Sequence, residues 1–204
     1  MTTCYKLTRQ DNTTHNGCKW GEGVTHETSG EGDLCSSGWL HAYSHPLIAV
    51  FMNPRHADIK SPKLWECLGD GEYLDYHGLK CGYTRLTTVR EIPLPQVTTE
   101  QRVAFAILCA KEVCKDPEWS AWADNWLRGA NRTKAAARVA ALAAARVAGE
   151  AVWVARAAAS AADYAAAWAV AREAAREAAL AAAWAADVAS DIDLVCIAKR
   201  AMEY

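Results

Sequence analysis

The chain has 204 residues, which is long enough to build a real hydrophobic core in one domain or in one domain with an appendage. Its formal net charge of −2 argues against sequence-independent nucleic-acid binding, which needs a dense cationic face. No uncharged apolar run reaches the roughly 18 residues of a membrane span, and the first ten residues lack the apolar segment of a secretory signal. We therefore expect a cytoplasmic protein without membrane contact, whose eight cysteines are reduced thiols.

Residues 1–96 carry all six histidines and alternate strand-like segments with turn signals. Strands are expected at Cys4–Leu7, Lys63–Leu68 and Arg85–Ile92. The second strand is expected to end in a hairpin turn at Gly69–Gly71, and the third at Pro93. Ser44 is expected to cap a short helix that ends at Asn53–Pro54. The sequence therefore predicts a small, strand-dominated α+β domain over residues 1–96.

A helical connector is expected over residues 97–130. Thr98 and Gln101 form the pattern of a capping box at the start of its first helix. The apolar face of that helix is expected to pack on the α+β domain through Val103, Ile107, Ala110 and Cys114. A second helix begins at Asp116–Pro117, ends at Gly129 and carries one stripe of tryptophans at Trp119, Trp122 and Trp126. Such a stripe is typical of a core, and an aromatic ligand cage is the alternative.

Residues 131–204 are predicted to form an all-α, alanine-rich helical region. More than half of residues Ala135–Ser190 are alanine. Alanine has the highest helix propensity but buries little apolar area, so such helices need close partners along their length. The large side chains do not share one face, which makes a single straight helix a poor model. Breaks are expected at Gly149 and at Ser160–Asp163.

Charge is unevenly distributed over this tail. Basic residues dominate from Arg128 to Arg156, including Arg138 and Arg146, and acidic residues dominate from Asp163 to Asp193. This pattern favours an antiparallel helical hairpin or an assembly of subunits, so we expect a homo-oligomer that associates through the tail. A monomeric helical spacer is the alternative. Nucleic acid ranks last among the expected partners, because only the basic segment suits it.

Candidate site residues gather in the segment Leu34–Phe51. Cys35, His41 and His45 are of the types that bind zinc, but Pro46 directly after His45 keeps the two histidines off a shared helical turn. We therefore expect ordinary hydrogen-bonded histidines and no metal. The expected ligand-binding residues are Trp20, His41, Tyr43 and His45. No familiar catalytic or nucleotide-binding signature is present, so the catalytic residues are unknown and no cofactor is predicted.

Five segments follow one another in a distinctive order: YKL (5–7), GCKWGEGVTH (17–26), LCSSGWLHAYSHPLIAV (34–50), LWECLG (64–69) and LTTVREI (86–92). In this order they resemble an uncharacterised domain family of tailed phages, whose members often carry repetitive pentapeptide or alanine-rich tails. The resemblance covers residues 4–95. It implies an origin in a phage or prophage.

The same region is more distantly similar to ADP-ribosyltransferase-like folds. The similarity implies counterparts of that family's functional groups at Lys6, at the His41/Tyr43 pair, and at Glu91 or Glu66. In such an enzyme the carboxylate would stabilise an oxocarbenium-like ribose. Lys6 departs from the family's pattern, because an Arg or His is expected at its position.

The residues and the resemblance together predict a phage-encoded accessory protein whose N-terminal domain binds a host protein or a small nucleotide-like ligand. A counter-defence factor would act in this way. We expect binding rather than catalysis. The alternatives are an NAD-consuming transferase and a structural or assembly protein.

Overall fold

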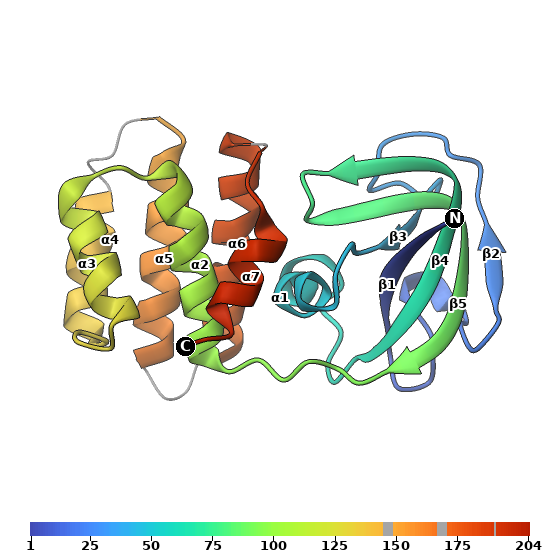
Figure 1. Ribbon diagram of the computed structural model, residues 1–204, viewed down its shortest axis with the longest axis horizontal. Coiled ribbons are helices and arrows are strands. Elements are labelled where there is room, and N and C mark those ends of the chain that lie inside the picture. Colours follow the sequence, from blue (N-terminus) through green and yellow to red (C-terminus); the bar gives the residue numbers. More distant parts are fainter. Residues whose placement is uncertain (145–148, 167–170, 190) are drawn as a thin grey trace. The chain divides into compact units, whose positions relative to one another are not determined.

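The structure, a computed structural model, covers residues 1–204 and describes all of them except 145–148, 167–170 and 190 (Figure 1). The chain divides into two compact units, Met1–Gln96 and Val97–Tyr204. The first holds the strands of one antiparallel sheet, and the regular elements described in the second are all helices. The predicted α+β class is confirmed. The connector and the alanine-rich tail, which we expected as separate regions, belong to one unit.

The first unit contains five strands, a short 3-10 turn and one α-helix. In chain order these are β1 (Thr2–Thr8), η1 (His15–Gly17), β2 (Thr25–Glu27), β3 (Leu40–Ala42), α1 (Pro46–His56), β4 (Lys63–Tyr76) and β5 (Lys80–Ile92). The strands pair in the order β1-β4-β5-β2, and β3 also pairs with β5. The long β4–β5 hairpin is therefore the centre of the sheet.

A backbone bridge closes this sheet on itself. Tyr5 in β1 and Tyr43 just after β3 exchange two hydrogen bonds, each 2.8 Å between N and O. The strands β1, β4, β5 and β3 therefore surround a common interior. The side chains packed there are Cys4, Trp20, Leu40, Ala42, Trp65, Cys67, Cys81, Tyr83 and Leu86.

The hairpin turn expected at Gly69–Gly71 is wrong. The strand β4 continues through these residues to Tyr76, with an irregularity in register between Asp70 and Tyr73. Gly71 has a φ of +77°, and a Cβ there would collide with the hydroxyl of Thr84, so this glycine permits a bulge. The turn lies at His77 and Gly78, with φ values of +49° and +70°, which suit a tight hairpin turn.

The predicted helix after β3 is present, but both of its ends differ from expectation. The N-cap of α1 is His45 and not Ser44, because the His45 ring nitrogen Nδ1 accepts a hydrogen bond from the Leu47 N–H at 3.2 Å. The helix also continues past Asn53 to His56, with Pro54 inside it. The carbonyl of Asn53 accepts from Ala57 N–H at 3.1 Å and so keeps the last turn helical.

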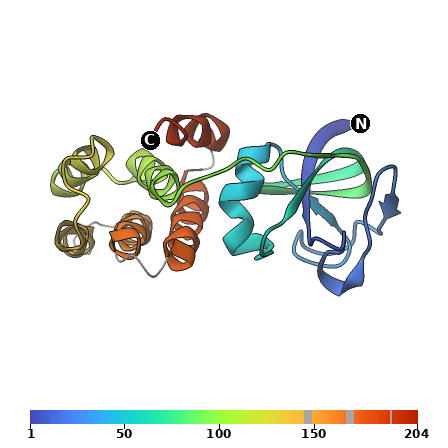
Figure 2. The same cartoon turned by 90° about the horizontal axis from the view of Figure 1, so that it is seen from below.

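The second unit is a two-layer arrangement of six described helices. They are α2 (Thr99–Val113), α3 (Pro117–Leu127), α4 (Lys134–Ala144), α5 (Ala151–Ala166), α6 (Ala171–Val188) and α7 (Leu194–Ala201). Figure 2 shows α3, α2 and α7 in one layer and α4, α5 and α6 in the other. None of the described helices is long and apolar enough to span a membrane.

The helix α2 is the centre of this unit. The predicted capping box is confirmed, because Gln101 N–H donates to Thr98 Oγ1 at 3.1 Å and Thr98 N–H donates to Gln101 Oε1 at 2.9 Å. Residues 103–110 are all buried, and α2 packs against α3, α5, α6 and α7. The face that we expected to pack on the α+β domain therefore forms the core of the helical unit.

The tryptophan stripe of α3 is a core element, as predicted. Trp119, Trp122 and Trp126 are 0%, 8% and 2% exposed. Trp119 donates from Nε1 to the carbonyl of Ala155 in α5 at 3.2 Å, and its ring lies 5.8 Å from the ring of Trp122. The helix ends at Leu127 with Arg128 as its C-cap, and Gly129 directly after the cap has the expected positive φ of +77°.

Alanine fills the contacts between α5 and α6. The buried alanines of these two helices are 155, 157, 158, 159, 161, 162, 174, 175, 178, 179, 181, 182, 183, 185 and 186. The rejection of a single straight helix is confirmed, and Gly149 lies between α4 and α5 with a φ of +68°. The break expected at Ser160–Asp163 is wrong, because α5 runs through it to Ala166.

The predicted pairing of basic and acidic segments is visible in one contact. Arg138 in α4 lies 3.5 Å from the carboxylate of Asp163 in α5. Arg146 belongs to the basic segment of the prediction but lies outside the described residues. The alanine-rich helices thus fold back on their own chain, while self-association stays a prediction.

Candidate functional site

Of the four expected ligand-binding residues, Trp20 lies in the interior of the closed sheet. Its side chain is 2% exposed, and Nε1 donates to Thr14 Oγ1 at 3.2 Å. The ring packs edge-on against His26 at 4.5 Å between centroids and lies under the ammonium group of Lys6 at 4.4 Å. Trp20 is therefore a core residue whose polar and cationic contacts are already made within the protein.

His41 and Tyr43 lie on the outer side of the same sheet. His41 in β3 pairs with Gly82 in β5, so a side chain at Gly82 would lie on the same face of the sheet as His41. A Cβ on Gly82 would come within 3.1 Å of Trp39, so Trp39 lies on this face as well. His41 Nε2 donates to the carbonyl of Leu34. His45 serves as the helix cap. The four expected residues therefore do not form one site, because Trp20 is separated from the others by the sheet.

A second group of residues gathers around His41 and Tyr43, and we call it the histidine cluster: His41, Tyr43, His56, Lys80 and Cys35. Tyr43 and His56 stack with 6.2 Å between centroids and 13° between planes. Lys80 Nζ donates to the exposed Cys35 Sγ at 3.0 Å. His56 Nδ1 is buried and has no hydrogen-bond partner in the described part of the chain. His56 and Lys80 were not predicted, since they are distant from β3 in sequence.

Both histidines of this cluster favour the neutral form. Burial lowers the pKa of His56 to about 4, and the nearby charges of Lys80 and Arg55 act in the same direction. Burial also lowers the pKa of His41, although its hydrogen bond to Leu34 opposes the shift. Burial and the neighbouring Lys80 account for the direction of both shifts.

Acidification is expected to destabilise the first unit through His56. Because its folded pKa is about 4 against an ordinary 6.5, the unfolded chain takes up the proton first. The stabilisation is therefore complete above pH 6.5 and is lost as the pH falls towards 4, on the order of 1–2 kcal/mol after solvent screening. His56→Phe keeps the stacking and removes the titration, so its unfolding free energy from urea denaturation is expected to vary less with pH.

The matched control is His77→Asn in the exposed turn between β4 and β5, which is expected to follow the wild-type pH profile. If His56→Phe loses stability in acid as steeply as the wild type, His56 is not the group responsible.

Lys6 is an unusual buried cation. Its side chain is 7% exposed, and Nζ donates to the carbonyl of His41 at 2.7 Å. Burial lowers the pKa of Lys6, while the neighbouring thiols of Cys67, Cys18, Cys4 and Cys81 oppose the shift. These contacts give Lys6 a structural role: its ammonium group links β3 to the Trp20 ring inside the closed sheet.

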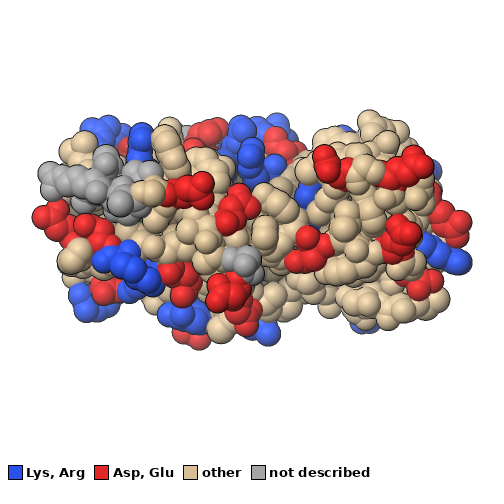
Figure 3. All heavy atoms as spheres, turned by 90° about the horizontal axis from the view of Figure 1, so that it is seen from above, with Lys and Arg blue, Asp and Glu red and all other residues tan. Residues whose placement is uncertain are grey.

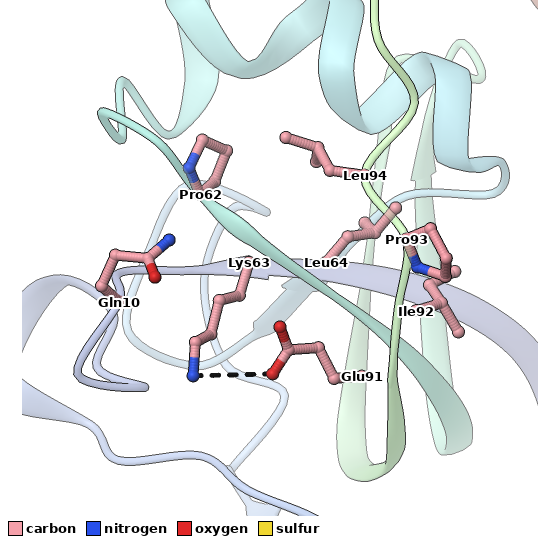
Figure 4. A pocket seen from close by; sticks show the side chains of 8 residues that line it. All are labelled: Gln10, Pro62, Lys63, Leu64, Glu91, Ile92, Pro93 and Leu94. Carbon is pink, nitrogen blue, oxygen red and sulfur yellow. Dashed lines mark ion pairs between the residues drawn. The ribbon is translucent and has the colours of Figure 1, made fainter.

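A cavity of about 400 Å³ lies where the paired ends of β4 and β5 meet the segment after β1. Its lining residues are Gln10, Pro62, Lys63, Leu64, Glu91, Ile92, Pro93 and Leu94. Figure 4 shows the side chains of Lys63 and Glu91 pointing toward one another, with Nζ and Oε2 3.5 Å apart. Lys63 Nζ also donates to Asn12 Oδ1 at 2.9 Å. The cavity is largely open to solvent.

The two glutamates that the transferase similarity implies have different surroundings. Glu91 lines the cavity, whereas Glu66 accepts a hydrogen bond from Arg90 at 2.9 Å on the surface. Lys6, the third implied group, makes its contacts inside the core. Lys63 and Gln10 were not predicted as site residues, because they meet Glu91 only through the pairing of β4 with β1 and β5, which places the segment after β1 beside the cavity.

The remaining observations restrict the classes of site. The described residues contain no group of three or more His, Cys, Asp and Glu side chains placed to hold a metal ion. Figure 3 shows acidic and basic side chains mixed on the described residues of the face in view, without a continuous basic surface. Comparisons of the chain with family models, with curated proteins and with solved structures find no match.

Proposed function

We propose that the first unit is a binding module for a small nucleotide-like ligand, and that the ligand's base edge lies in the cavity of Figure 4. The observation that carries this proposal is the Lys63–Glu91 pair, which sets a cation and a carboxylate side by side at the wall of the cavity. The cavity replaces the pocket expected around Trp20, His41, Tyr43 and His45, whose members are split between two sides of the sheet.

The pair is suited to a ligand that offers an acceptor next to a donor. Its Nζ–Oε2 distance of 3.5 Å is longer than an ordinary hydrogen bond, so the contact leaves hydrogen-bonding capacity on both groups. The hydrogen bond to Asn12 holds the ammonium group in place, and the Glu91 side chain is 49% exposed. A guanine edge meets these requirements: its O6 would accept from Lys63, and its N1–H and N2–H groups would donate to Glu91.

The other lining residues include apolar side chains that could contact an apolar part of the ligand. Pro62, Ile92, Pro93 and Leu94 also line the cavity, and in Figure 4 they lie above and to the right of the ion pair. The amide of Gln10 adds one more donor and acceptor at the rim.

Glu91→Gln is expected to weaken binding of guanosine monophosphate at least about tenfold, because the amide replaces one acceptor by a donor that faces the N–H groups of the base. The measurement is calorimetric titration of the full chain. Glu27→Gln is the matched control, since Glu27 forms a surface ion pair with Arg85 at the same distance of 3.5 Å. Equal affinity in Glu91→Gln and Glu27→Gln, or no saturable binding of guanosine monophosphate, adenosine monophosphate or NAD by the wild type, contradicts the proposal.

The transferase alternative is tested with the same proteins. The carboxamide of nicotinamide also presents an acceptor beside a donor. The position of Glu91 in the cavity is the observation that favours the transferase alternative. Consumption of NAD that stops in Glu91→Gln would support a transferase over a binding module. The accessory role in a phage and the host-protein partner rest on the resemblance alone, and they stay predictions.

A further inference from the structure

The outer face of the layer formed by α4, α5 and α6 carries large apolar side chains on its surface. Leu142 is 69% exposed, Trp153 is 52% exposed and Tyr164 is 38% exposed. On the opposite side α5 and α6 pack on α2, so the outer face is the one that the described helices of the unit leave uncovered (Figure 2). Soluble monomers rarely expose several such groups together, and a face of this kind commonly marks an interaction surface.

Two stripes run along this face. The stripe of α5 consists of Trp153, Arg156, Ser160 and Tyr164, and the stripe of α6 consists of Glu173, Glu177, Leu180, Trp184 and Val188. Each follows helical spacing, so its members lie on one side of their helix. The rings of Trp153 and Trp184 are 6.2 Å apart between centroids, which places the two stripes side by side on the same face.

We propose that this face is the contact surface of a homodimer, in which a second copy of the chain lays its own α5 and α6 against it. The face carries charges of both signs: Arg156 is exposed on α5, and on α6 Glu173 and Glu177 lie one turn apart beside the exposed Arg172 and Arg176. Neither glutamate forms an ion pair within the described part of the chain. Arg156 of a second copy adds a cation opposite these glutamates, so a face that carries both signs of charge is complementary to itself.

A twofold axis parallel to the helices gives this pairing a specific geometry. Rotation about such an axis keeps the direction of each helix, so α5 of one copy lies over α6 of the other at the same level. The tryptophans of both copies then meet at one end of a four-helix contact. Arg156 comes within about one helical turn, roughly 5 Å along the axis, of Glu177 in the second copy, a distance that its side chain spans.

The electrostatic state of α6 agrees with this arrangement. Partial burial raises the pKa of Glu177, the like charge of Glu173 acts in the same direction, and the neighbouring Arg176 opposes the shift. Arg156 lies 5.5 Å from the Trp153 ring centroid within its own chain, a contact that holds the guanidinium on the outer face. Both groups are therefore positioned for a charged partner. The proposed dimer does not depend on the ligand of the first unit.

Charge reversal with rescue tests the dimer. In sedimentation equilibrium of the full chain, the wild type is expected to be a dimer, and Arg156→Glu and Glu177→Arg are each expected to weaken it about tenfold or more. The double variant restores opposite charges across the interface, so its dissociation constant is expected to return towards that of the wild type. Arg200→Glu on the exposed side of α7 is the control, and it is expected to dimerise as the wild type does.

Two outcomes overturn the proposal: a monomeric wild type, or single variants that dimerise as strongly as the control. Helical content from circular dichroism verifies that each variant is folded. If Arg156→Glu loses its helical signal, Trp153→Gln replaces it. This change removes a half-exposed ring from the end of the contact where the tryptophans meet and is expected to abolish the dimer while the helices remain.

Discussion

Trp119→Ala is expected to lower the free energy of unfolding of the helical unit by about 3–5 kcal/mol, the usual range for truncating a fully buried large aromatic residue. The Trp119 side chain is completely buried, and its indole contacts Trp122 in its own helix. Removal also leaves the Ala155 carbonyl without the donor that Trp119 provides. Because α5 consists largely of alanine, few large neighbours are available to fill the resulting cavity.

The measurement is urea denaturation followed by circular dichroism of the helical signal. Tyr204→Ala is the control, because this aromatic side chain of the same unit is 40% exposed and its loss is expected to cost less than about 1 kcal/mol. A comparable loss in the two variants would mean that the tryptophan stripe is not the centre of the helical core.

Lys6→Met is expected to change how the stability of the first unit depends on pH. Burial lowers the folded pKa of Lys6 below its ordinary 10.5, so between the two values the unfolded chain binds more protons than the folded chain. Wild-type stability therefore rises with pH in this window, by up to about 1.4 kcal/mol per pH unit. Methionine does not titrate, so this contribution is absent from the variant.

The informative quantity is the difference in unfolding free energy between the wild type and Lys6→Met, measured from neutral pH up to the ordinary lysine pKa of 10.5. The difference is expected to grow in favour of the wild type as the pH rises. Thiol ionisation affects both proteins in the same direction, since burial raises the pKa of Cys67 and of Cys81 to about 12. Lys60→Met on the surface is the control. A constant difference would show that the folded chain does not disfavour the charged form of Lys6.

The elements that could be predicted from the sequence are those whose signals are local. The capping box of Thr98 and Gln101 and the stripe from Trp119 to Trp126 depend on residues a few positions apart, and both are present as expected. The hairpin turn was misplaced because GDG at residues 69–71 and HG at residues 77–78 both have turn composition. Only the pairing of β4 with β5 decides which of them reverses the chain.

The candidate site was less predictable because it depends on which side of the sheet a residue faces. Trp20 lies in a long irregular segment whose sequence does not show that it covers the interior of the closed sheet. The bridge between Tyr5 and Tyr43, which closes that sheet, joins residues 38 positions apart and has no local signature. Lys63 and Glu91 likewise meet only through strand register, so their cavity emerged from the structure alone.

The ligand cavity is tested most directly by a ¹⁵N chemical-shift titration of the full chain with guanosine monophosphate. Saturable shifts are expected at the amides of residues 10, 63, 64, 91, 92 and 94, which line the cavity, and these shifts are expected to be lost in Glu91→Gln. Amides of α1 and of the histidine cluster are expected to stay unchanged. Shifts confined to His41, His56 and Lys80 would place the binding site on the other group of residues and contradict the proposed one.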